Sequence, residues 1–240
     1  MRSRQQHILN TVVEEYIKIG DAVSSRLLYE NFDFGISPAL IRSELHDLMD
    51  QGYLEQPHTS GGRIPTDKGL RFFVDALIVE PSRTIERETR YADSFLEGSI
   101  WNSLDAAVKF FSDRLETLSV GYEPEGAIIC KRGLRFLLRR VETEDRAETI
   151  KVVDDFEKLD ERLADFVRRF REEDLPQVFI GSESPLTTST QLSFIAEHYR
   201  LPSDEELMMV VIGPKRMNYR RNLAVMKTVK NKLQERRSRR

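Results

Sequence analysis

The chain has 240 residues, of which 40% are hydrophobic and 32% charged, and its formal net charge is −3. This length allows a small module and a second domain with its own core. There is no run near the ~20 consecutive apolar residues of a membrane helix and no signal peptide in residues 1–7, so we expect a cytoplasmic protein without a membrane partner. The single cysteine, Cys130, excludes an internal disulfide framework and a cysteine-rich zinc site.

Charge alone does not indicate a nucleic-acid partner. Residues 1–75 hold 8 Lys/Arg against 11 Asp/Glu, so an argument for DNA depends on where the bases lie. Residues 227–240 hold 7 Lys/Arg against 1 Asp/Glu, and we treat 236–240 as a basic tail. Such a tail either touches phosphate or is simply a solvated helix end.

Apolar residues recur at helical spacing three times in the first fifty residues. The predicted helices span 3–18, 23–32 and 38–51. Ser24 or Ser25 is placed to cap the second helix. The third helix has the stronger start signal, because Ser37 can cap free backbone N–H groups and Pro38 is tolerated at the first helical position.

The third predicted helix has distinct inner and outer faces. Ile41, Leu45 and Leu48 recur at i, i+4 and i+7 and form its inner face. This spacing turns four other residues outward: Ala39, Arg42, Ser43 and His46.

A β-hairpin is predicted next, with strands at 53–57 and 63–65 around a small, polar, glycine-rich tip at 58–62. Another helix runs from 66 and ends before Pro81. Three short helices followed by a hairpin are typical of a winged helix-turn-helix, in which the third helix enters the major groove. We therefore expect a DNA-binding domain over 1–80.

The exposed chemistry of this domain suits DNA. The Arg42 guanidinium can make two hydrogen bonds to a guanine edge. Ser43 and His46 can donate or accept hydrogen bonds, and the small Ala39 permits close approach. A solvated helix face is an equally simple interpretation of these residues. Arg63 lies in a tip whose glycines let backbone amides approach phosphate. The candidate DNA-binding residues are Ser25, Arg26, Ser37, Ala39, Arg42, Ser43, His46, Ser60, Gly61, Gly62 and Arg63.

A second, α+β domain is predicted over 104–235, after a charged linker at 81–103. Its helices are expected at 104–118, 159–170 and 218–233. Strands of an antiparallel sheet are expected at 127–129, 134–141, 149–153, 178–180, 192–199 and 207–212. We therefore expect an α+β protein with helices at both ends of the second domain.

The second domain offers no catalytic or metal-binding pattern. Ser182 or Ser184 as a nucleophile needs a histidine base, and His198 is the histidine in this half of the chain; we interpret it as a strand residue. There is no cluster of ligands at metal spacing and no phosphate-binding glycine loop. We expect no enzyme activity, no catalytic residue, no cofactor and no metal.

Several blocks of the sequence are typical of one protein family. The most specific is the ungapped run 52–69, GYLEQPHTSGGRIPTDKG. The others are 4–9, 13–17, 37–42, 178–181 and 211–219. In these blocks the chain resembles the HrcA family of heat-inducible transcription repressors. The resemblance implies that the C-terminal domain is GAF-like.

The resemblance also implies a function. Family members are dimers that bind an inverted-repeat operator, called CIRCE, ahead of chaperone operons, and the chaperonin maintains their active form. Leu40 and Ser43 stand where the family usually has threonine and asparagine, which bears on the operator sequence that is read. The chain is also short for the family, and the segment it lacks corresponds to an inserted domain associated with dimerisation.

The expected function is therefore negative regulation of transcription by a homodimer that binds double-stranded DNA, associates with the nucleoid and is released under stress. The alternative is a metabolite-responsive winged-helix regulator with a ligand pocket in its C-terminal domain.

Overall fold

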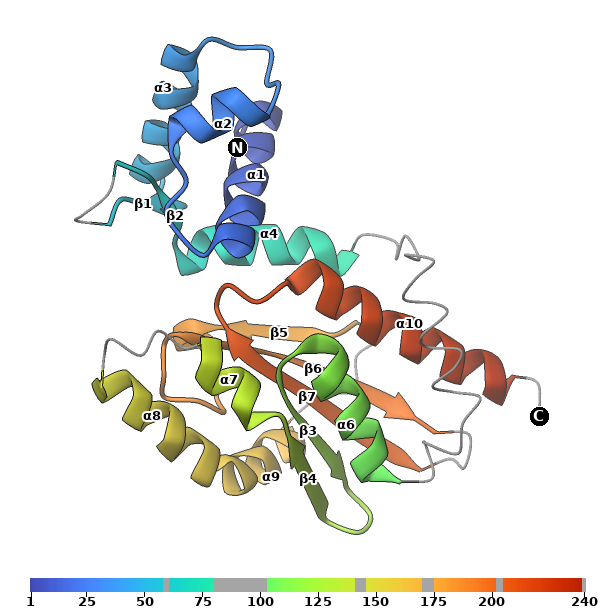
Figure 1. Cartoon of the computed structure of the whole chain (residues 1–240). Coiled ribbons are helices and arrows are strands. Elements are labelled where there is room, and N and C mark those ends of the chain that lie inside the picture. Colours follow the sequence, from blue (N-terminus) through green and yellow to red (C-terminus); the bar gives the residue numbers. More distant parts are fainter. Residues whose placement is uncertain (58–60, 80–102, 141–145, 170–174, 202–204, 239–240) are drawn as a thin grey trace. The chain divides into compact units, whose positions relative to one another are not determined.

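A computed structural model describes residues 1–57, 61–79, 103–140, 146–169, 175–201 and 205–238 (Figure 1). The chain divides into two compact units, Met1–Leu77 and Ile78–Arg240. The expected linker at 81–103 lies outside the described residues except for its last residue. The protein is α+β with antiparallel sheets, as predicted.

The first unit is built from four helices and a short hairpin, although its last helix continues to Val79. The elements are α1 (Ser3–Ile19), α2 (Ser25–Asn31), α3 (Pro38–Asp50), β1 (Leu54–Glu55), β2 (Ile64–Pro65) and α4 (Asp67–Val79). Gly20 ends α1 because it takes a φ of 73°, a left-handed conformation that costs glycine little. Ser24, one of the two serines considered, caps α2 by accepting a hydrogen bond from the Leu27 N–H at 3.1 Å.

Close backbone contacts hold the hairpin against the rest of the first unit. Val23 and Arg63 form an antiparallel bridge with two N–H to C=O hydrogen bonds of 2.9 Å. Gly62 is buried beside Ala22, and a Cβ at this position would lie 2.8 Å from the Ala22 backbone. A side chain at Gly62 would therefore push the hairpin away from the α1–α2 connection.

The second unit contains a five-stranded antiparallel sheet in the order β4-β3-β7-β6-β5. Its strands are β3 (Leu118–Glu123), β4 (Ile128–Arg132), β5 (Gln177–Ile180), β6 (Leu192–Arg200) and β7 (Glu206–Pro214). Its helices are α6 (Leu104–Leu115), α7 (Leu134–Arg140), α8 (Arg146–Glu157), α9 (Leu159–Arg169) and α10 (Tyr219–Arg237), and a 3₁₀ turn spans Gly181–Glu183.

Helices cover both faces of this sheet (Figure 1). On one face, a buried cluster joins the strands to α7, α8 and α9; it includes Leu137, Val152, Leu163 and Phe194. On the other face lie α6 and α10, where the Tyr199 hydroxyl donates a hydrogen bond of 3.3 Å to the Met226 carbonyl. The sheet is therefore the middle layer of three.

Two predicted strands are wrong. Residues 149–153 are rich in β-branched side chains but lie in α8, where Glu148, Val152 and Asp155 are buried at i, i+4 and i+7. Ile150 is 53% exposed, so the packing of this segment, rather than its β propensity, determines its structure. The predicted strand at 134–141 is mostly α7, because Gly133 takes a φ of 93° at the end of β4 and turns the chain away from the sheet.

The predicted helix at 104–118 is too long, and a strand was missed after it. The helix α6 ends at Leu115 because Glu116 takes a left-handed φ of 52°. Leu118 then begins β3, which pairs with both β4 and β7 in the sheet.

Asp155 joins α8 to the loop that leads into β6. Its carboxylate is buried and accepts hydrogen bonds from the Thr188 N–H at 2.8 Å, the Ser189 N–H at 2.9 Å and the Arg162 guanidinium at 2.7 Å. Burial opposes ionisation, but these donors outweigh it and hold the pKa of Asp155 below its usual value.

We predict that Asp155→Asn destabilises the second unit by about 2–4 kcal/mol, because the amide cannot accept from all these donors and Arg162 loses its charged partner. Urea unfolding at pH 7 measures the loss. The matched control is Asp165→Asn, which removes a surface carboxylate paired with Arg168 and is expected to change stability little. Equal effects of the two substitutions would contradict the prediction.

The same carboxylate predicts a dependence on pH. Because the folded-state pKa is lowered, the stabilisation by Asp155 is fully present above the unfolded pKa of about 3.9 and is lost as pH falls through the folded value. The free energy of unfolding of Asp155→Asn is therefore expected to fall less steeply below about pH 4 than that of the unmodified protein.

Candidate nucleic-acid interface

Helix α3 exposes one polar face along most of its length. Ile41, Leu45 and Leu48 are buried in the unit, as the spacing predicted. The four residues predicted to face outward are all exposed: Ala39, Arg42, Ser43 and His46. Ser37 fixes the start of this face, because its Oγ accepts a hydrogen bond of 3.3 Å from the Leu40 N–H.

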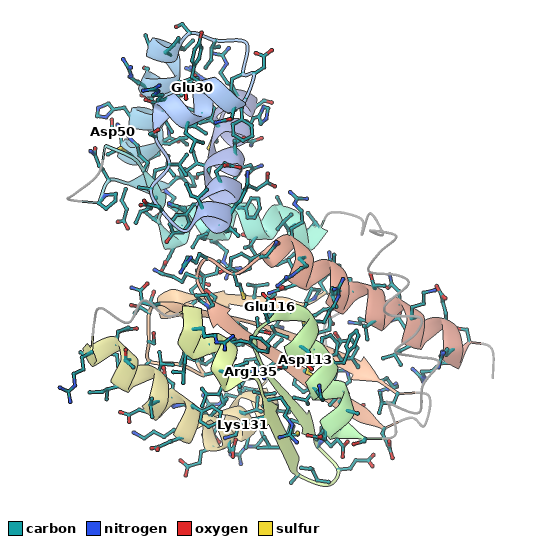
Figure 2. The ribbon with its side chains drawn as sticks, in the orientation of Figure 1. Glu30, Asp50, Asp113, Glu116, Lys131 and Arg135 are labelled. Carbon is teal, nitrogen blue, oxygen red and sulfur yellow. The ribbon has the colours of Figure 1, made fainter. Side chains whose placement is uncertain are left out.

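Charge is unevenly distributed along α3. Arg42 lies in its first half, is exposed, and has no side-chain partner among the residues that the structure describes. Two exposed carboxylates, Asp47 and Asp50, lie in its second half; Asp50 is labelled in Figure 2. His46 Nε2 lies 3.7 Å from Asp50 Oδ2. The N-terminal half of the helix is thus the half suited to an anionic partner.

The start of α2 contributes two of the predicted residues. Ser25 is partly buried at the first helical position, directly after the cap. Arg26 is exposed and its Nε lies 2.7 Å from Oε1 of Glu30, which is labelled in Figure 2. Exposed pairs of this kind contribute little to stability, so Arg26 can exchange its carboxylate for a phosphate at small cost.

The hairpin holds Arg63 against α3. Its Nε donates to the Met49 sulfur at 3.4 Å, and its Nη1 donates to the Gly61 carbonyl at 2.9 Å. Gly61 is exposed, and a Cβ there would meet nothing within 4 Å, whereas Gly62 is buried against Ala22. The Gly61 backbone is therefore open to a partner, and Gly62 acts in packing. Ser60 lies outside the described residues.

Three residues beside this face were not among the predicted DNA-binding residues. Leu40 is 39% exposed in the first turn of α3. Lys68 Nζ donates to the Gln51 carbonyl at 2.7 Å, at the end of α3, and lies 4.4 Å from the centre of the Tyr53 ring. Glu44 is buried, with Oε1 3.5 Å from Arg4 Nη1. The helical spacing of the sequence already placed Leu40 outside the buried stripe of α3. The position of Lys68 could not be predicted in this way, because it depends on how the hairpin folds.

The second unit contains a cleft between α6 and the β4–α7 connection, with a volume of about 560 Å³. Its lining is Asp105, Lys109, Ser112, Asp113, Arg132, Gly133, Leu134 and Arg135. Its charged side chains pair with one another: Arg135 lies 3.4 Å from Asp113, both labelled in Figure 2. Lys109 also pairs with Asp113, and Arg132 pairs with Asp105. No sequence motif indicated which residues line this cleft.

Two of the residues considered for catalysis, Ser184 and His198, make structural contacts, and Ser182 is exposed in the 3₁₀ turn. Ser184 Oγ accepts hydrogen bonds from the N–H groups of Leu186 and Thr187 and so stabilises a turn. His198 lies on β6 with Nε2 3.5 Å from Glu206 Oε2 on β7. In the described ranges no three His, Cys, Asp or Glu side chains are grouped to hold a metal ion. No described helix is both long and apolar enough to span a membrane.

Known proteins resemble the chain in sequence and in fold. The family model described as HrcA protein C terminal domain matches residues 77–223. The heat-inducible transcription repressor HrcA of Natranaerobius thermophilus is 57% identical over 75 residues, which are 31% of this chain and 22% of that protein. The repressor of the same name from Carboxydothermus hydrogenoformans is 39% identical over 139 residues, which are 56% of this chain and 40% of that protein.

A solved structure titled as a hypothetical protein at 2.2 Å resolution matches all of this chain and 99% of its own, with a TM-score of 0.78 and 20% identity, which supports the fold alone. The matched stretches span less than half the length of the two curated relatives. The family match covers more than half of this chain and confirms the family predicted from its motifs. By this match, the chain belongs to the HrcA family.

Proposed function

We propose that the chain is a repressor of transcription in which the first unit is a winged helix-turn-helix and α3 enters the major groove. The observation that carries the proposal is the exposed face of α3, where Ala39, Arg42, Ser43 and His46 lie on the side opposite its buried stripe. These side chains combine a small residue, a planar guanidinium that can donate two hydrogen bonds, and groups that can donate or accept hydrogen bonds. Side chains of these kinds read base edges.

The hairpin supports the same proposal. The Val23–Arg63 bridge adds a third chain segment beside β1 and β2, so the hairpin is held at its base. Hydrogen bonds to the Met49 sulfur and the Gly61 carbonyl hold the Arg63 guanidinium beside the exposed backbone of Gly61. In this proposal Arg63, Gly61 and Ser60 follow the DNA backbone as a wing, and Ser25, Arg26 and Ser37 contact phosphates near the ends of α2 and α3.

The wider biological proposal extends from the family. The chain acts as a cytoplasmic, nucleoid-associated homodimer on an inverted-repeat, CIRCE-like operator ahead of chaperone genes, and the chaperonin keeps it active. A dimer follows physically, because one winged helix recognises one half-site and an inverted repeat presents two. In this proposal the second unit is a GAF-like regulatory and dimerisation domain.

The packing beneath α10 supports release of the repressor by heat. Ser193 Oγ, Glu197 Oε2 and both polar side-chain atoms of Asn222 are buried without a hydrogen-bond partner in the described chain. Glu197 pairs with Lys230 at 2.6 Å, and burial raises its pKa. Polar groups buried in this way reduce stability. We propose that unfolding which begins here exposes the apolar strands β6 and β7 to chaperonin.

A metabolite sensor remains the second candidate, and the cleft between α6 and α7 is the observation that favours it. Its volume of about 560 Å³ lies within the range of small-molecule sites, but its charged groups already neutralise one another. A saturable thermal shift with one compound of a metabolite library, reduced by Lys109→Ala, would support this function over control by chaperonin alone.

We predict that Arg42→Ala and Arg63→Ala weaken DNA binding in different ways. Loss of a bidentate base contact by Arg42 costs about 1–3 kcal/mol and relaxes specificity at that position. Loss of a phosphate contact by Arg63 weakens all sequences alike and lowers the salt slope by about one. The measurement is binding of each variant to a selected operator and to random duplex across a salt series.

The matched control for these two variants is Lys18→Ala, an exposed cation at the end of α1 paired with Glu15, which is expected to bind like the unmodified chain. If Arg42→Ala and the unmodified protein showed the same preference among DNA sequences, the proposed contact between Arg42 and a base would be wrong.

We predict a homodimer at the concentrations at which the protein binds its operator. Light scattering of the full chain, alone and with an operator duplex, measures the mass directly. A strictly monomeric protein on a two-half-site operator would contradict this part of the proposal.

We predict that Asn222→Leu raises the midpoint of thermal unfolding by about 2–4 °C, because it replaces two buried unpaired polar atoms by apolar ones in a side chain with the same number of heavy atoms. The temperature at which operator binding is lost is expected to rise with it. Asn31→Leu is the control, because the Asn31 side chain is exposed at the end of α2. A lower midpoint for Asn222→Leu would show that the polar groups are satisfied and would remove this support for heat lability.

Control by chaperonin is tested by diluting denatured repressor with or without purified chaperonin and ATP and measuring operator occupancy. The expected result is a higher DNA-binding fraction with chaperonin. Equal recovery without it, or recovery by a small metabolite alone, would favour the sensor function instead.

A further inference from the structure

Leu40 is an exposed apolar side chain in the first turn of α3, and 39% of it is accessible. A single exposed leucine is ordinary on a protein surface. Its position here is specific, however, because Ala39 precedes it and Arg42 and Ser43 follow within one turn. If α3 enters DNA as proposed above, the side chain of Leu40 leaves water at the same time as these three.

The charges of α3 indicate which end of the helix lies deepest in the major groove. Asp47 lies two turns after Leu40 on the same flank, and Asp50 lies further along; both are exposed carboxylates. Phosphates line both edges of the groove and repel such groups, so the C-terminal half of α3 is unfavourable inside it. The N-terminal end combines Arg42 with the positive end of the helix dipole, and it therefore enters first.

The direction of helical side chains brings Leu40 still closer to the groove floor. Side chains on an α-helix lean toward its N-terminus, so Leu40 covers the turn that Ser37 begins. The 5-methyl of thymine is the largest apolar group that the bases present in the major groove. Packing a leucine against that methyl removes apolar surface of both groups from water without desolvating a polar base edge.

We propose that Leu40 determines specificity by packing against a thymine methyl group in each operator half-site. This inference deepens the proposed function and rests on it. The inference predicts a thymine at an operator base pair that the polar side chains of α3 do not read. It also predicts that operator affinity depends on an apolar contact.

The test uses the full chain and a duplex that this chain selects from a random-sequence library. Each thymine of the duplex is replaced in turn by deoxyuridine, which removes only the methyl group. At one position in each half-site the replacement is expected to weaken binding about fourfold, the factor that corresponds to ~0.8 kcal/mol for one buried methyl-sized group.

The variants assign that effect to Leu40. Leu40→Ala is expected to bind the thymine and uracil duplexes equally, and Leu40→Met, which keeps an apolar side chain, to retain the preference. Ile19→Ala, which truncates an equally exposed apolar residue at the end of α1, is expected to behave like the unmodified chain.

The outcomes separate the two levels of the proposal. Sequence-specific binding with no methyl dependence, or a methyl dependence that persists in Leu40→Ala, overturns the role of Leu40 and leaves the proposed function intact. Failure of the full chain to select any duplex overturns the proposed function, and the role of Leu40 falls with it.

Discussion

Burial of one apolar stripe on α3 governs which polar side chains this helix exposes. Ile41, Leu45 and Leu48 are almost fully buried, where α3 packs on α1 and α2. A rotation of α3 about its axis by one residue would expose part of this stripe, at a cost of about 1.5–3 kcal/mol for each large side chain. The core therefore fixes which side chains face outward, although none of the outward residues is itself part of the core.

Residues 1–75 hold more Asp and Glu than Lys and Arg. Several of these cations have partners of their own: Arg26 pairs with Glu30, Arg71 with Asp75 and Arg4 with Glu44. If the proposed function holds, binding cannot depend on a large excess of phosphate contacts and must take much of its free energy from the groove. Affinity that is less sensitive to salt and more sensitive to base identity follows from this balance.

The two helix layers of the second unit differ in how their buried polar groups are paired. On one face of the sheet, Asp155 accepts several hydrogen bonds and locks α8 and α9 to the loop before β6. On the other face, α10 packs over buried polar atoms that lack partners in the described chain. If the proposed release by heat holds, local opening would begin at the unpaired polar atoms beneath α10.

The sequence by itself determined the elements of the first unit and its outward residues. Capping serines, the Ser37-Pro38 start and the helical recurrence of apolar side chains act within a few residues of one another, so their effect can be predicted locally. Only the tertiary structure decided the fate of 149–153, whose β-branched residues join a helix because Val152 and Asp155 are buried from the same side. It also decided that Gly62 packs against Ala22 and that Arg63 lies on Met49. These features depend on contacts between segments far apart in the sequence, and the energy of packing them outweighs the local preference of either segment.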